Sequence, residues 1–196
     1  GLALFTENPE ILGELSEKYE TDYEKIHPEL RFAVLRAKMK LDEPEVFDEM
    51  LAKYQETSDP EMRSDILLAL TSAEQHNDTL IDLLKKPKIV RPQDHLHLFI
   101  YLMRNGKTAP LATKWLYENW DYLEKMTGEK SIEDYPRALA SFIRTVKDSN
   151  DFDEFFGPKM DNPVLTRTIE VAKGDIFARL RLIQMDSDDV HRHLLG

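Results

Sequence analysis

The histidines of this 196-residue chain are few, and their spacing offers no ready metal site. The motif His-Glu-x-x-His, which is absent, sets two imidazoles on one helix face so that both can bind one zinc ion. His95 and His97 are two residues apart and would point about 200° away from each other on a helix. We therefore expect one packed and one solvated side chain. An independent metal hydrolase that uses His95 and His97 is kept as an alternative.

Other catalytic chemistry has equally little support. The chain contains no cysteine, which excludes thiol catalysis, disulfides and cysteine-ligated metals. Its glycines are isolated from one another, so no phosphate-binding loop is predicted, and no Gly-x-Ser-x-Gly sequence occurs. Carboxylate pairs such as Glu133 and Asp134 fall at predicted helix starts, where they favour the helix dipole. We predict no catalytic residue, no metal ligand and no cofactor in this chain.

A basic surface on the helix expected over 131–147 is the best candidate for binding. Arg137, Ser141 and Arg144 are spaced by four and three residues, which would place them on its polar face. The planar fork of arginine suits carboxylates and amide carbonyls, so this face could contact a peptide. A solvated basic face is the alternative. A second basic cluster, on a later helix, is interpreted as solvated: Arg167, Lys173, Arg179 and Arg181.

We expect helices to position these side chains, because prolines near possible helix-capping residues recur along the whole chain. Proline fits the first turn of a helix, where the amide that it lacks would have no partner. The prolines expected at helix starts are Pro9, Pro28, Pro44, Pro60, Pro92 and Pro163. Apolar residues between them recur every three or four positions, and no alternating run is long enough for a strand. The predicted helices span 9–19, 27–41, 43–57, 60–73, 77–86, 92–105, 108–126, 131–147, 150–156, 162–185 and 187–195.

The predicted class is all-α, with an irregular HEAT/armadillo-like α-solenoid of about ten to eleven helices as the favoured architecture. The apolar run at 96–103 predicts a helix that is covered on several sides, and the next helix has a wide apolar face. Both features suit stacked helical hairpins, with a compact bundle as the alternative. We expect one domain over 1–196, which divides into a leading linker and helix (1–26), first hairpins (27–90) and a second half (91–196).

Charge and composition restrict the partners. The net charge of −11 and the pI near 5.0 argue against binding to nucleic acid or to an anionic membrane surface. No apolar run approaches the roughly 20 residues that span a bilayer. The lack of cysteine fits a cytoplasmic location. Because the chain begins with Gly1 and not with methionine, we expect a segment of a longer polypeptide.

Several segments, in their order and spacing, resemble the C-terminal domain of the aminopeptidase N family. The segments that carry the resemblance are Ile89–Asp94, Trp115–Leu123, Phe142–Arg144, Phe152–Phe156 and Leu165–Glu170. In the first half, His27–Arg31 and Tyr54–Pro60 are similar to the lactic-acid-bacterial branch of that family. The resemblance extends from about residue 8 to residue 195.

This resemblance implies a function for the chain as part of a larger zinc metallopeptidase, which removes single residues from peptide N-termini. The chain would be the helical cap that closes over the catalytic domain and shapes the substrate chamber, without activity of its own. Zinc would belong to the catalytic domain of the parent enzyme. The expected partners are the N-terminal and catalytic domains of the same polypeptide, and the peptide substrate.

Within this resemblance, Arg144 matches most closely an arginine that points into the chamber in some relatives. The second arginine that often follows it is replaced by Thr145. Arg137 and Ser141 are the other chamber candidates. A free-standing helical-repeat scaffold that binds a partner protein or peptide is the alternative function.

Overall fold

The computed structural model describes residues 8–22, 25–41 and 45–195, and every regular element among them is a helix. Five of the six predicted proline starts are confirmed, since Pro9, Pro28, Pro60, Pro92 and Pro163 each open an α-helix. The sixth, Pro44, lies outside the described residues. The predicted all-α class is therefore confirmed, whereas the solenoid arrangement stays a prediction. None of the described helices is long and apolar enough to cross a membrane.

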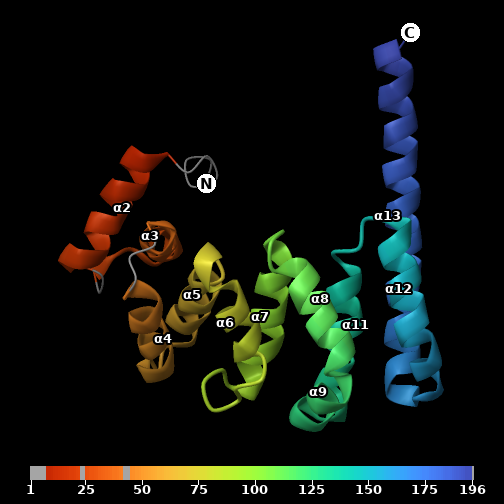
Figure 1. Cartoon of the computed structure of the whole chain (residues 1–196), viewed down its shortest axis with the longest axis horizontal. Coiled ribbons are helices and arrows are strands. Elements are labelled where there is room, and N and C mark those ends of the chain that lie inside the picture. Colours follow the sequence, from red (N-terminus) through yellow and green to blue (C-terminus); the bar gives the residue numbers. More distant parts are fainter. Residues whose placement is uncertain (1–7, 23–24, 42–44, 196) are drawn as a thin grey trace. The chain divides into compact units, whose positions relative to one another are not determined.

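The chain forms two compact units, Gly1–Ala112 and Thr113–Gly196. The first unit contains α2 (Pro9–Asp22), α3 (Pro28–Lys40), α4 (Val46–Glu56), α5 (Pro60–Leu70), the 3-10 turn η2 (Glu74–His76), α6 (Asn77–Leu83) and α7 (Pro92–Arg104). In this unit α2 packs on α3, α3 and α4 both pack on α5, and α5 packs on α7 (Figure 1). Its core includes fully buried Leu35, Met50, Tyr54, Ile66 and Phe99.

The division between the units falls within α8 (Ala109–Glu118). The second unit continues with α9 (Trp120–Thr127), α10 (Glu129–Ile132), α11 (Asp134–Ala140), α12 (Val146–Phe156), the 3-10 turn η3 (Gly157–Asp161) and α13 (Pro163–Leu195). Helix α12 runs beside the first part of α13, and the C-terminal part of α13 extends beyond it (Figure 1). Aromatic rings fill the contact between α9 and α12, where Trp120 and Phe156 meet edge to face at 5.2 Å.

The structure differs from four predicted helices, all of which reach into the second unit. The helix expected over 108–126 is divided at Asn119, whose side-chain amide donates to the carbonyl of Trp115 over 2.8 Å. The helix expected over 131–147 is also divided at Glu133 and ends at Ala140. The two last predicted helices are a single helix, α13, because the chain continues through 186 without a break. The second of these corrections changes the candidate binding surface.

Candidate functional site

The candidate site lies between α11 and the first half of α13. Asn162 caps α13: its side-chain oxygen accepts a hydrogen bond from the amide of Val164 over 3.0 Å, and Pro163 fits the first turn. From there one apolar stripe of α13 is buried in the second unit: Leu165, Ile169, Ala172 and Ile176. Helix α11 is short, but Tyr135 and Leu139 are buried and fix its inner face. The two helices are therefore held together by apolar packing.

A polar contact also joins α13 to the start of α11. The hydroxyl of Thr168 donates to the backbone carbonyl of Glu133 over 2.8 Å. Glu133 is the residue at which α10 ends and α11 begins. The threonine hydroxyl thus ties the backbone at this break to the facing helix α13.

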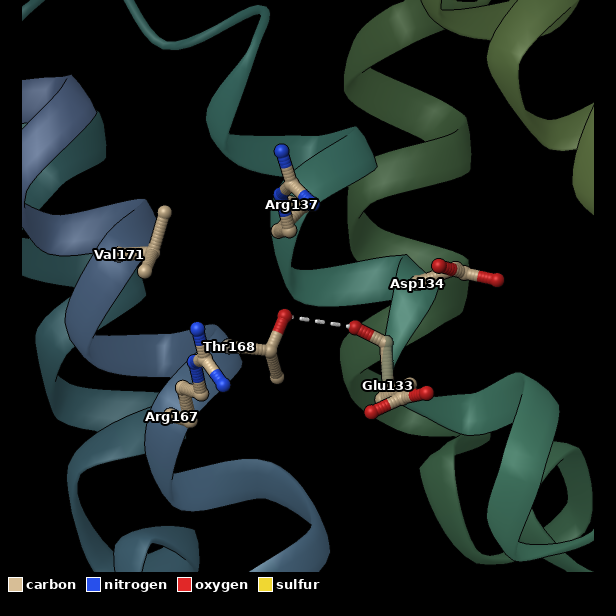
Figure 2. Close-up of a pocket in the computed structure, with 6 residues that line it drawn as sticks. All are labelled: Glu133, Asp134, Arg137, Arg167, Thr168 and Val171. Atoms are coloured by element: carbon tan, nitrogen blue, oxygen red, sulfur yellow. Dashed lines mark hydrogen bonds between the residues drawn. The ribbon is translucent and has the colours of Figure 1, made fainter.

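A pocket of about 370 Å³ opens beside this hydrogen bond. It is lined by Glu133, Asp134, Arg137, Arg167, Thr168 and Val171. Figure 2 shows that Arg137 extends from α11, whereas Arg167, Thr168 and Val171 come from the facing helix α13. The pocket thus combines two guanidinium groups, two carboxylates, one hydroxyl and one apolar side chain.

The two arginines of the pocket are free to bind a ligand. Both side chains are exposed, and neither guanidinium forms an ion pair or hydrogen bond with any residue that the structure describes. Ion pairs occur elsewhere in the second unit, for example between Lys147 and Asp151 at 2.7 Å and between Lys173 and Asp153 at 3.1 Å. The pocket can therefore attract an anionic group, but its lining offers no nucleophile with an adjacent base.

The structure separates the three residues expected on one polar helix face. Arg137 is on α11, but Ser141 lies just past its end, where the hydroxyl donates to the carbonyl of Ala138 over 2.7 Å. Arg144 is in the connection to α12, and its Nη1 donates to the carbonyls of Ser141 and Ile143 over 2.7 and 3.0 Å. The expected shared face of a 131–147 helix is wrong, because the helix stops at Ala140.

Arg179 does not fit the interpretation of a solvated cluster. Its Nη1 donates to the carbonyl of Ala140 over 2.7 Å and to that of Ile143 over 3.3 Å. Burial, followed by the nearby positive charge of Arg144, lowers the pKa of Arg179 from its usual value. Arg179 and Arg144 thus both donate hydrogen bonds to carbonyls at or just past the C-terminal end of α11. A helix C-terminus favours positively charged partners.

Arg167, which was expected on a solvated face, belongs to the candidate site. It is exposed, as expected, but it lines the same pocket as Arg137. The two residues are thirty positions apart, so no local spacing in the sequence relates them. Only the packing of α13 on α11 brings them to one pocket.

The histidine pair is arranged as one packed and one exposed side chain. His95 is buried, and its Nε2 lies 2.8 Å from the carbonyl of Leu84, so this nitrogen must carry the hydrogen. Burial lowers the pKa of His95, which favours the neutral ring. His97 is exposed and stacks on Tyr101. The described residues contain no cluster of three histidine, aspartate or glutamate side chains suited to a metal ion.

Comparison with known proteins defines the class of this helical chain. Residues 1–176 match the profile of the ERAP1-like C-terminal domain. This chain belongs to the family of ERAP1-like C-terminal domains, as the resemblance to aminopeptidase N led us to expect. The match ends at Ile176, within α13.

Several proteins with sequences similar to this chain are aminopeptidases. Aminopeptidase N of Lactobacillus helveticus is 26% identical over 196 residues, which cover 96% of this chain and 23% of that protein. Aminopeptidase N of Lactococcus lactis subsp. lactis (strain IL1403) is 28% identical over 198 residues, or 97% of this chain and 23% of the relative. Glutamyl aminopeptidase of Rattus norvegicus is 30% identical over 120 residues, or 58% and 12% of the two chains. This chain therefore spans about a quarter of the length of the bacterial relatives that it matches.

Proposed function

We propose that this chain is the C-terminal cap domain of a zinc aminopeptidase that removes N-terminal residues from peptides. One observation carries the proposal: two bacterial aminopeptidase N sequences align with 96% and 97% of this chain, yet each alignment covers only 23% of the relative's length. A domain with this relation to its relatives works as part of a larger polypeptide. Its partners are the N-terminal and catalytic domains of that polypeptide, in the cytoplasm.

Zinc belongs to the catalytic domain in this proposal and not to the helices of this chain. The sequence has no His-Glu-x-x-His motif. His95 and His97 do not fit a metal site either. His95 already donates its Nε2 hydrogen to the carbonyl of Leu84, and His97 lies exposed. When bound in the catalytic domain, zinc would supply a Lewis acid for peptide-bond hydrolysis.

The cap contributes to the reaction through access and positioning. A helical cover over the active site limits entry to short or unfolded peptides and excludes bulk water. It also offers side chains to the part of the peptide beyond the scissile bond, which lowers the entropic cost of a productive geometry. Arg137, Ser141 and Arg144 are the candidates for lining that chamber. Arg137 is supported by its place in a pocket, and Arg144 by its exposed side chain.

Substrate length provides the test of this cap role. We would compare the full-length enzyme with a form that lacks the segment 1–196, using a pentapeptide and an aminoacyl 4-nitroanilide. Removal should lower kcat/KM for the pentapeptide by about tenfold more than for the nitroanilide, because only the peptide reaches the cap. Retained nitroanilide activity shows that the catalytic part is folded. Equal retention of both activities would contradict the proposal.

A further inference from the structure

Two arginines without partners share one pocket in a chain whose net charge is −11. Such a chain has an excess of carboxylates with which its arginines could pair. Neither Arg137 nor Arg167 pairs with any of them in the described part of the chain. They approach the pocket from two different helices, so a ligand between them could contact both guanidinium groups (Figure 2).

We infer that Arg137 and Arg167 form a two-point site for a carboxylate group of a peptide. Arginine binds a carboxylate through parallel N–H donors, and two arginines can take one oxygen each or share both. This inference rests on the proposed function in so far as the peptide is the substrate of the parent enzyme. It adds Arg167 to the candidate residues and gives the chemical class of the group that is bound.

The acidic part of the lining distinguishes a peptide from other anions. Glu133 and Asp134 border the same pocket, and their negative charges oppose a dianion such as phosphate. Next to a peptide carboxylate, however, there are backbone N–H groups, which can donate to these acidic side chains. The side chain of Asp134 extends away from α13 in Figure 2.

The apolar part of the lining fits a peptide as well. Val171 is 42% exposed, one turn beyond Arg167 on α13, and it also lines the pocket. A hydrophobic side chain of the ligand could cover it while the carboxylate lies between the arginines. Thr168 stays occupied by its bond to Glu133 and serves to hold the two helices in place.

Titration of the 196-residue chain with small peptides tests the site directly. The ligands are trileucine with a free carboxylate, trileucine amide, leucyl-glutamyl-leucine amide and inorganic phosphate. The readout is the NMR signal of the arginine Nε–H groups in 15N-labelled protein, together with the dissociation constant. We expect trileucine to bind with a Kd of about 1 mM and to shift two arginine signals. Trileucine amide should bind about tenfold more weakly.

Variants assign the site to its residues. Arg137→Gln and Arg167→Gln should each raise the Kd for trileucine about tenfold, and each should remove one shifted signal. Arg181→Gln is the matched control, because Arg181 is exposed on the same helix but does not line the pocket. If leucyl-glutamyl-leucine amide binds as well as trileucine, the carboxylate can come from a side chain; if it binds like trileucine amide, the site takes a C-terminal carboxylate. Either result supports the inference.

Four results would overturn it: equal binding of trileucine and its amide, unchanged binding by the two pocket variants, tighter binding of phosphate than of every peptide, or no binding of any of these ligands. The length dependence of the full-length enzyme is measured separately, so the proposed cap role can stand when the carboxylate site fails.

Discussion

Thr168 on α13 donates a hydrogen bond of 2.8 Å to the backbone carbonyl of Glu133, thirty-five residues earlier in the chain. The contact fixes the start of α11 against α13, and the candidate pocket opens beside it. Arg137 follows Glu133 by four residues and Arg167 precedes Thr168 by one. The relative position of the two arginines therefore depends on this contact and on the apolar stripe beneath it.

Replacing Thr168 with valine tests the importance of this hydrogen bond. Thr168→Val keeps the shape of the side chain but leaves the Glu133 carbonyl without its partner. Since Thr168 is only 8% exposed, we expect the free energy of unfolding to fall by about 1–2 kcal/mol in urea denaturation. Val171→Thr is the control on an exposed position of the same helix, with an expected change within about 0.5 kcal/mol. Equal effects of the two substitutions would contradict this role of Thr168.

Glu74 in the first unit predicts a pH-dependent contribution to stability. Its carboxylate is bound by Lys107 and by Lys40, the latter over 2.7 Å, and these hydrogen bonds lower its pKa to about 2. A lowered folded pKa gives stability that is complete above the ordinary carboxyl value of 4.5 and is lost as the pH falls toward 2. The side chain is 42% exposed, so solvent screening limits the contribution to at most about 1 kcal/mol.

The variant Glu74→Gln should therefore be less stable than the parent at pH 7 and approach it below pH 4.5. Urea denaturation at pH 7, 5 and 3.5 measures this difference. The control is Glu118→Gln, since Glu118 forms a longer and more exposed pair with Lys114 at 3.7 Å, and a smaller effect is expected. A stability difference that grows on acidification would show that the sign is wrong.

Arg144 supplies a kinetic prediction for the parent enzyme. If its exposed guanidinium contacts the distal part of the substrate, Arg144→Ala in the full-length enzyme should raise KM for peptides by about tenfold. Aminoacyl 4-nitroanilides, with a small leaving group, should be affected least. Because Arg144 also donates to the carbonyls of Ser141 and Ile143, the unfolding midpoint is measured in parallel. Unchanged KM for both substrate types would remove Arg144 from the chamber.

The helix starts were largely predictable from sequence because each start has a local cause. Pro28 and Pro60 open α3 and α5, and Asp59 accepts hydrogen bonds from the amides of Glu61 and Met62. Proline geometry and side-chain capping act within three or four residues, so the sequence contains the whole signal. Trp115 and Trp120, which follow the helical period, are both buried.

The end of α11 also had a local signal, although the apolar period concealed it. A helix over 131–147 would place Val146 on the same apolar face as Leu139, yet Val146 is 67% exposed. Thr145 caps α12: its hydroxyl oxygen accepts a hydrogen bond from the amide of Asp148 over 3.1 Å. A threonine followed three residues later by an acidic residue is typical of a helix start. That signal would have ended the earlier helix before Thr145.

No signal in the sequence, by contrast, indicates that Arg137 and Arg167 line the same pocket. It follows from tertiary packing between helices that are separated by α12 and η3. Local periodicity fixes which face of each helix is buried, but it does not say which two helices meet. The proposal of a carboxylate site therefore depended on the structure.

The central claim is that this chain is the trailing domain of an aminopeptidase, and the gene that encodes it offers the most direct test. The measurement is the nucleotide sequence upstream of the codon for Gly1, in the same reading frame. We predict an uninterrupted frame of several hundred codons that contains His-Glu-x-x-His. A start codon directly before Gly1, with no such frame upstream, would contradict the claim and favour a free-standing helical scaffold.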